Sequence, residues 1–91
     1  MANERQVIEH FREIDLKSPS DIIIQQIKGL ISSGVLRPGD RLPAERALAE
    51  RFRIGRWHIR EAIKKLEFYG ILKTLPQSGT IVTSLGAKAL E

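Results

Sequence analysis

The fold is decided by the stretch PAERALAERFRIGRWHIREAIKKLEFYG, which spans residues 43 to 70. It predicts a short helix that ends near Phe52, a turn at residues 53–55 and a longer helix over residues 56–69. The apolar residues of the longer helix recur at spacings of three and four, which places on one buried face Ile59, Ala62, Ile63 and Leu66. Two helices joined by such a turn can place the second helix in the major groove of DNA.

The opposite face of the longer helix is basic. At four-residue intervals it carries Arg56, Arg60 and Lys64, and its first turn adds Trp57 and His58. Arginine can donate two parallel hydrogen bonds to a guanine edge in the major groove. We therefore predict that these five residues contact DNA, with Lys64 as a rim charge that adds general attraction.

Each of these residues also has a purely structural interpretation. Arg56 and Arg60 could contact phosphates or form salt bridges with acidic residues of their own helix. Trp57 could pack against the turn or a partner subunit instead of a thymine methyl group or a sugar edge. His58 could be a neutral polar neighbour instead of a pH-sensitive phosphate donor.

Positive charge is concentrated around these two helices. Residues 37–65 hold nine cations and four acids, a net charge of +5, whereas the whole chain of 91 residues has +4. A basic patch on an otherwise balanced chain is typical of a surface that binds nucleic acid. Charge alone also leaves open a solvated surface face with no partner.

Two further helical segments are expected before this stretch. Residues 1–17 are predicted to be an arm whose helical apolar stripe consists of Val7, Ile8, Phe11 and Ile14. A helix then begins after Ser18, a favourable N-cap, with Pro19 at its first position, and runs to about Ser33. The arm is too short to be a stable helix alone, so we expect it to pack on a neighbouring surface.

A β-hairpin is expected after the longer helix. Strand-forming residues at 71–75 and 80–83 flank the turn signal Pro76-Gln-Ser-Gly79, and Arg41-Leu42 is expected to form a short strand. Three helices and this hairpin predict an α+β fold, a winged helix-turn-helix over residues 18–83 whose wing is residues 71–83. Residues 84–91 are expected to be a linker toward an absent C-terminal effector-binding domain.

The composition argues against other classes of protein. With no cysteine and only two histidines, we expect no metal site and no cofactor. The chain has no apolar run of 18 residues and no signal peptide, so we expect a cytoplasmic protein without a membrane span. The sequence shows no catalytic triad, no phosphate loop and no carboxylate pair, so we do not expect an enzyme. Glu45 and Glu61 are interpreted as helix caps or as ion-pair partners of the arginines.

Several motifs occur in a fixed order within residues 20–82. They are Arg37-Pro-Gly-Asp-Arg-Leu-Pro-Ala-Glu-Arg-Ala-Leu-Ala-Glu50, Ile59-Arg-Glu-Ala-Ile63, Leu66-Glu67, Gly70-Ile-Leu72 and Gly79-Thr-Ile-Val82. In sequence and spacing they resemble the DNA-binding domain of GntR-family transcriptional regulators. The Ala-Glu-Arg and Ile-Arg-Glu-Ala elements look most like the FadR-like subfamily.

The resemblance implies a bacterial repressor or activator. The intact protein is expected to be a homodimer that binds double-stranded DNA at a palindromic operator, with a small-molecule effector bound by a separate C-terminal domain. By position, Arg46, Arg56 and Arg60 match the DNA-contacting arginines of the family. The tip of the hairpin matches the wing of the family and consists of Gln77, Ser78, Gly79 and Thr80. Within it, Gly79 is predicted to serve the backbone turn and Thr80 to donate to a phosphate.

Three departures from the family pattern affect the expected DNA contacts. The turn usually reads Gly-Val-Ser, but here it is Arg53-Ile-Gly55, and a left-handed arginine costs on the order of 1 kcal/mol. Trp57 and His58 replace two small hydroxyl residues, which affects base preference more than DNA binding itself. The wing commonly reads Gln-Gly-Arg-Gly, but Pro76-Gln-Ser-Gly79 has no arginine, so we expect weaker contacts at its tip.

Two functions of different classes are compatible with these patterns. The first is a sequence-specific DNA-binding domain of a metabolite-responsive bacterial transcriptional regulator. The second is a winged-helix module for protein–protein interaction. The basic face of residues 56–69 favours the first, because an interaction module would present an apolar or mixed-charge face there.

Overall fold

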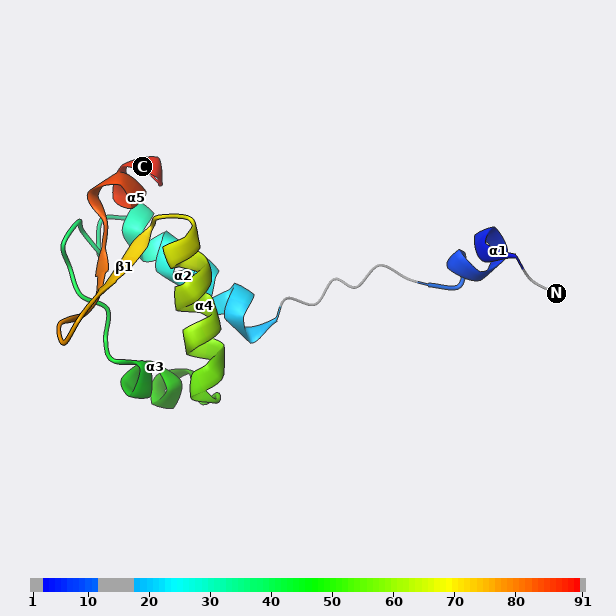
Figure 1. Ribbon diagram of the computed structural model, residues 1–91, viewed down its shortest axis with the longest axis horizontal. Coiled ribbons are helices and arrows are strands. Elements are labelled where there is room, and N and C mark those ends of the chain that lie inside the picture. The colour runs from blue at the N-terminus through cyan, green and yellow to red at the C-terminus, as the bar shows by residue number, and fades with distance from the viewer. Residues whose placement is uncertain (1–2, 12–17, 91) are drawn as a thin grey trace.

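The computed structural model describes residues 3–11 and 18–90 and confirms the predicted winged helix. Its elements, in chain order, are α1 (Glu4–Ile8), α2 (Pro19–Ser32), α3 (Glu45–Phe52), α4 (Arg56–Phe68), β1 (Leu72–Leu75), β2 (Gly79–Val82) and α5 (Ser84–Ala89). Figure 1 shows the wing beside α4, with α3 near one end of α4 and α5 near the other. Within the described ranges, no helix is long and apolar enough to cross a membrane.

Helix α4 packs at the centre of the domain. It contacts α2, α3 and β1, and its three innermost side chains are fully buried: Ile59, Ala62 and Leu66. The core opposite them comes mainly from the β-branched face of α2, which includes Ile23, Ile27 and Ile31. The fourth residue of the expected apolar stripe, Ile63, is only half-buried at the edge of this core. Because most of the apolar stripe of α4 is used by the core, its polar stripe faces outward and is free to meet another molecule.

The sequence signals at the ends of the helices behave as predicted. The Ser18 hydroxyl accepts a hydrogen bond from the backbone N–H of Asp21 at 3.2 Å, with Pro19 at the first helical position of α2. After α3, Arg53 adopts a left-handed conformation with φ 60° and donates its N–H to the carbonyl of Ala49. The turn therefore does contain a left-handed residue, at a cost on the order of 1 kcal/mol for an arginine.

The wing is paired on both edges of β2. Strand β1 is antiparallel to it, with Leu72 opposite Val82 and Leu75 opposite Gly79. On the other edge, the Leu42 N–H donates to the Thr80 carbonyl at 2.9 Å, next to an isolated bridge between Arg41 and Ile81. The expected short strand is therefore this bridged segment, and it ties the base of the wing to the loop before α3.

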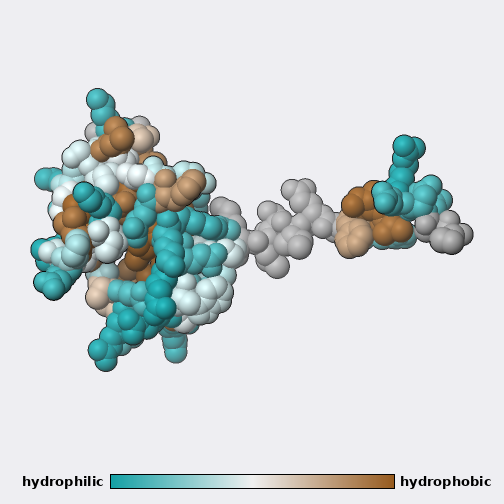
Figure 2. Space-filling view, viewed as in Figure 1, coloured by the Kyte–Doolittle hydropathy of each residue, from teal (hydrophilic) through white to brown (hydrophobic). Residues whose placement is uncertain are grey.

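The arm is only partly helical in the described residues. Helix α1 begins with a capping box between Asn3 and Gln6 and ends at Ile8, earlier than the apolar stripe suggested. Every described residue of the arm is exposed, Phe11 among them at 69%. Figure 2 shows apolar surface on this segment. The remainder of the expected arm, residues 12–17 with Ile14, lies outside the described residues.

Residues 84–89, expected to belong to a linker, form helix α5 packed on the domain. The Thr83 hydroxyl accepts a hydrogen bond from the Gly86 N–H at 2.9 Å and donates to the Gly70 carbonyl at 2.6 Å. Gly86 and Ala87 are buried, and Leu90 packs against the core. Hydrophobic periodicity could not predict this helix, because it is short and one of its two buried residues is a glycine. That the segment leads to a further domain stays a prediction.

Substituting Gly86 with alanine is expected to destabilise the domain. A Cβ at this position would lie 2.4 Å from the Ile71 Cα and 2.8 Å from the Ile71 carbonyl oxygen, which are backbone atoms that cannot turn aside. We expect the free energy of unfolding in urea to fall by about 1–3 kcal/mol. Gly29→Ala is the matched control, because nothing lies within 4 Å of its added Cβ inside α2. That control should be more stable than wild type by about 0.5–1 kcal/mol, whereas a stabilising Gly86→Ala would contradict the docking of α5.

Candidate nucleic-acid interface

The exposed face of α4 carries the predicted basic residues. The side chains of Arg56 and Arg60 are each 57% exposed, and Trp57 is 60% exposed beside them. Arg56 and Arg60 lie one helical turn apart on an exposed flank of α4 that adjoins the buried face of Ile59. The described residues hold no cluster of histidine, cysteine, aspartate and glutamate that could bind a metal.

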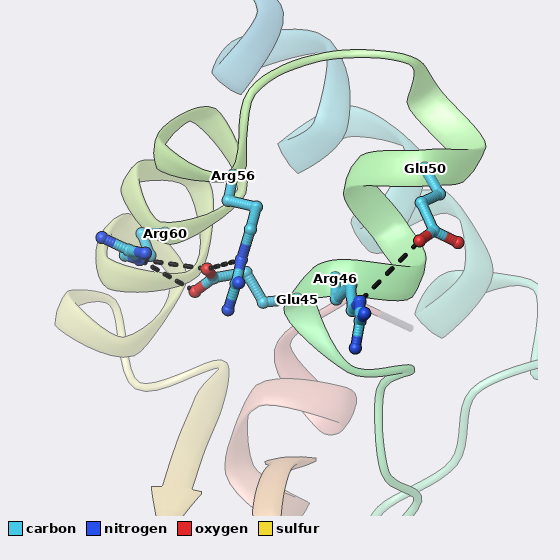
Figure 3. Close-up of polar contacts among 5 residues, drawn as sticks. All are labelled: Glu45, Arg46, Glu50, Arg56 and Arg60. Atoms are coloured by element: carbon cyan, nitrogen blue, oxygen red, sulfur yellow. Dashed lines mark hydrogen bonds and ion pairs between the residues drawn. The ribbon is translucent and has the colours of Figure 1, made fainter.

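Glu45, the first residue of α3, joins the two arginines of α4 (Figure 3). Its Oε1 accepts a hydrogen bond from the Arg56 Nε at 2.7 Å, and its Oε2 accepts one from the Arg60 Nε at 3.0 Å. These bonds engage Nε and leave the terminal amino groups of each guanidinium for a second partner. The salt-bridge partner of both arginines is therefore on the neighbouring helix and not on their own. Glu45 is an ion-pair partner of the arginines, as interpreted from the sequence.

The charges of this cluster stabilise one another. The hydrogen bond from Arg60 is the main cause that holds the pKa of Glu45 below its usual value of 4.5. Partial burial opposes that shift, and the hydrogen bond from Arg56 adds to it. In return, Glu45 raises the pKa of Arg60. Two cations around one carboxylate keep a net positive charge on this surface while limiting the directions in which the arginines can point.

Arg46 lies outside this cluster. It is on α3, its side chain is 80% exposed, and its Nε is 3.9 Å from Glu50 one turn further along the same helix. An exposed pair of this kind contributes about 0–1 kcal/mol and is easily exchanged for another anion. The pair therefore does not brace α3 against α4, and Arg46 is available to a phosphate.

The two lysines of α4 point to different surroundings. Lys64 borders a groove of about 200 Å³ between α4 and the wing, which is also lined by Arg60 and Thr80. Lys65 instead lies 3.6 Å from Asp21 of α2 and 4.0 Å from Glu61. Only Lys64 therefore belongs to the same surface as the arginines. That Lys64 is a rim charge of a DNA-binding surface stays a prediction, whereas Lys65 is held by acidic residues.

Trp57 and His58 form a stacked pair in the first turn of α4. Their ring centroids are 3.7 Å apart and their planes are inclined by 31°. His58 is half-buried beneath this contact, whereas the indole is mostly exposed. The two residues therefore present one aromatic surface next to Arg56.

The tip of the wing has a backbone with positive φ, as the glycine in its sequence suggested. Gln77 and Gly79 both have positive φ, 60° and 86°, and Ser78 donates its N–H to the Leu75 carbonyl at 3.1 Å. Glycine adopts such a conformation without strain, which confirms the predicted backbone role of Gly79. The tip carries no arginine, so it offers backbone and neutral polar groups to a partner.

Thr80 belongs to a hydrogen-bonded chain that ties the wing to α4. The Thr74 hydroxyl donates to Glu67 at 3.0 Å and lies 3.1 Å from the Thr80 hydroxyl. Since a hydroxyl has only one hydrogen, Thr80 must be the donor in its bond to Thr74. Its hydroxyl hydrogen is therefore already used, and the predicted donation to a phosphate would require this chain to break. Sequence reasoning missed Glu67 and Thr74, because no periodic pattern relates a helix residue to a cross-strand pair.

Residues 19–82 match the sequence profile of a family described as bacterial regulatory proteins, gntR family. The chain belongs to the gntR family. Fold and family together make it a DNA-binding domain of the transcriptional-regulator type and not an enzyme.

Curated relatives of this gntR-family chain include two repressors of Bacillus subtilis. The HTH-type transcriptional repressor YtrA is 39% identical over 74 residues, which cover 78% of this chain and 57% of YtrA. The HTH-type transcriptional repressor NagR is 40% identical over 73 residues, which cover 77% of this chain and 30% of NagR. The chain thus spans less than two thirds of the length of either relative.

Solved structures of similar fold include two informative cases. A transcriptional regulator from Oenococcus oeni superposes with a TM-score of 0.78 at 27% identity, covering 89% of this chain and 68% of that one. The DNA-binding domain of AraR, solved in complex with operator ORR3, gives a TM-score of 0.73 at 26% identity, covering 80% of this chain and 88% of that one.

The pH dependence of stability tests the Glu45 cluster of this gntR-family domain. Because the folded pKa of Glu45 is depressed, its stabilising effect is present above about pH 4.5 and is lost as pH falls through the folded pKa. Wild type should therefore be more stable than Glu45→Gln at neutral pH, with a difference that shrinks as the pH falls below the usual carboxylate range. Urea unfolding at several pH values measures this difference.

The control for this measurement is Glu61→Gln, because Glu61 pairs only weakly with Lys65 at 4.0 Å. The pKa of Asp21 is also lowered, chiefly by its hydrogen bond with Ser18, so wild type alone would lose stability in acid for two reasons. The comparison between variants removes the contribution of Asp21. A difference between wild type and Glu45→Gln that stays constant with pH would show that the carboxylate does not pair with the arginines in solution.

Proposed function

We propose that this domain recognises a palindromic DNA operator, with α4 in the major groove and the wing, residues 71–83, on the flanking backbone or minor groove. The observation that carries the proposal is the outward face of α4, where Glu45 holds the two exposed arginines side by side at 2.7 and 3.0 Å. A helix that shows paired guanidinium groups to solvent suits the edges of guanine bases. The operator complex of AraR, a related domain of the same fold, supports this assignment.

Each predicted contact residue has a role in this proposal. Arg56 and Arg60 contact base edges or the adjacent phosphates, and Arg46 contacts a phosphate from α3. Lys64 adds general attraction from the edge of the surface. The aromatic pair lies against the bases beside the arginines and consists of Trp57 and His58. The tip of the wing lies along the DNA backbone and consists of Gln77, Ser78, Gly79 and Thr80.

The assembly and regulation of the intact protein are also proposals. We infer a cytoplasmic homodimer, because a palindrome is matched by two copies related by two-fold symmetry. A small-molecule effector would act through a C-terminal domain beyond these residues and change the affinity for DNA. The FadR-like subfamily rests on the Ala44-Glu-Arg46 and Ile59-Arg-Glu-Ala62 motifs alone, and the curated relatives include YtrA and NagR.

The alternative of a protein-interaction module is not favoured. A protein-interaction module was expected to present an apolar or mixed-charge face on α4. The structure instead shows arginine side chains that are 57% exposed on this face, with their one acidic partner largely covered at 22%. That surface suits a polyanion better than a protein partner.

A selection experiment over a range of salt concentrations tests the proposed function. The chain is incubated with a pool of randomised DNA duplexes, and the bound fraction is sequenced at each salt concentration. Enrichment of one palindrome, with affinity that falls steeply as salt rises, is the expected result. Binding without enrichment would reduce the domain to a general electrostatic binder, and absence of binding at low salt would overturn the proposal. The double variant Arg56→Ala/Arg60→Ala is the control and should enrich no sequence.

A further inference from the structure

Gly55, the N-cap residue of α4, has no backbone reason to be glycine. Its φ of −67° and ψ of 149° are extended values that any residue adopts. Serine, threonine, aspartate and asparagine are favoured at an N-cap because their side chains accept a hydrogen bond from the first turn. No such side-chain hydrogen bond exists here. The missing side chain therefore needs another explanation.

The explanation is the position of Trp57. A Cβ on Gly55 would lie 3.2 Å from the indole Cδ1, which is tighter than most contacts of this kind, and 3.4 Å from the indole Nε1, which is at the edge of ordinary van der Waals contact. A side chain at position 55 would therefore require the five-membered ring of Trp57 to shift away from its position over the glycine. The same indole stacks on His58 with ring centroids 3.7 Å apart. The indole therefore lies over Gly55 and packs on His58 in the first turn of α4.

This arrangement gives an exposed side chain a defined orientation. Trp57 is 60% exposed, yet its ring packs on His58 and lies close to the position that a Cβ on residue 55 would take. A large apolar group that is ordered before binding loses less conformational entropy when it meets its partner. In the major groove, the apolar feature that distinguishes one base from the others is the methyl group of thymine.

We propose that Gly55 is a positioning residue for Trp57, and that Gly55, Trp57 and His58 act as one unit that selects a thymine in the operator. The unit lies beside Arg56, so the selected thymine is adjacent to the base or phosphate that this arginine contacts. This inference rests on the proposed function. It adds that the methyl group is the recognised chemical group and that the glycine at the N-cap is required for its recognition.

The first experiment uses the operator obtained by selection, with each thymine replaced in turn by deoxyuridine, which lacks only the methyl group. At one position in each half-site, wild type should bind the deoxyuridine duplex roughly fourfold more weakly, the effect of one buried methyl group. Trp57→Ala should bind both duplexes equally. Gly55→Ser should likewise bind the thymine and deoxyuridine duplexes equally. The double variant Gly55→Ser/Trp57→Ala should lose no more of the preference for thymine than either single variant does.

The second experiment follows the indole in the free protein. Trp57 is the only tryptophan of the chain, so its fluorescence reports on this position alone. Acrylamide should quench it more strongly in Gly55→Ser than in wild type, because the added side chain displaces the ring. Gly29→Ser is the matched control, since nothing lies within 4 Å of its Cβ, and it should leave both quenching and base preference unchanged.

The outcomes separate this inference from the proposed function. If wild type enriches no sequence, the proposed function fails and thymine selection fails with it, while quenching still decides whether Gly55 positions the indole. If wild type enriches an operator but Gly55→Ser keeps the full thymine preference, the positioning role is wrong. If no deoxyuridine substitution weakens binding by wild type, Trp57 does not recognise a methyl group, as expected if it meets a sugar edge instead.

Discussion

Replacing Arg60 with alanine is expected to lower affinity for the selected operator by about 1–3 kcal/mol, the discrimination that one bidentate arginine–base contact supplies. Affinity for random duplex should fall much less, because an electrostatic contact to phosphate contributes equally to every sequence. Arg60 is suited to this role because Glu45 holds its Nε at 3.0 Å and leaves the end of the guanidinium exposed. Competition titrations with operator and random duplex at one salt concentration measure the two losses.

Lys64→Ala is the matched control for Arg60→Ala. It removes a charge from the next turn of the same helix face, at the edge of the groove beside the wing. We expect it to weaken binding to all sequences similarly and to reduce the salt slope by about one. An equal loss on operator and random DNA for Arg60→Ala would make Arg60 a phosphate contact. A loss confined to the operator for Lys64→Ala would contradict its role as a rim charge.

Replacing Leu66 with alanine is expected to produce the largest loss of stability among these variants. Leu66 is fully buried on the inner face of α4, where the helix contacts α2 and β1. Truncating such a leucine costs about 2–5 kcal/mol, because the transfer energy of the lost atoms is added to that of the cavity they leave. Small domains are stable by about 5–15 kcal/mol in total, so this variant should be partly unfolded on warming. Urea unfolding followed by circular dichroism measures the change.

Leu85→Ala is the matched leucine control, because Leu85 is 78% exposed on α5. It should change the free energy of unfolding by no more than about 0.5 kcal/mol. Leu66→Ala should also reduce DNA binding, but only in proportion to the unfolded fraction, whereas Arg60→Ala should bind poorly while fully folded. A Leu66→Ala domain of wild-type stability would contradict the central packing of α4.

Helix α4 was predictable because two local patterns agree along it. The apolar spacing of Ile59, Ala62 and Leu66 and the basic spacing of Arg56 and Arg60 have the same helical period and occupy two different stripes of the helix, one buried and one exposed. Its observed end at Phe68 lies within one residue of the prediction. The left-handed turn residue could also be anticipated, although only the resemblance to a family with glycine there pointed to position 53.

The elements that escaped prediction depend on contacts between distant residues. Helix α5 is stabilised by the approach of Gly86 to the backbone of Ile71 and by the Thr83 hydroxyl, none of which leaves a periodic pattern. The chain from Glu67 through Thr74 to Thr80 requires the wing to fold back along α4. Secondary-structure propensity describes each segment separately, so it carries no information about contacts between distant segments.

The sequence by itself determined the positions of α2, α3 and α4 and which stripe of α4 is basic, because side-chain direction follows from helical period alone. Only the tertiary structure decided what those basic residues touch. Glu45 precedes Arg56 by 11 residues and Arg60 by 15, and it reaches both because α3 packs against α4. In the same way, the role proposed for Gly55 depends on the Trp57 indole that lies over it. Local periodicity orients side chains, but the packing of helices against one another selects their partners.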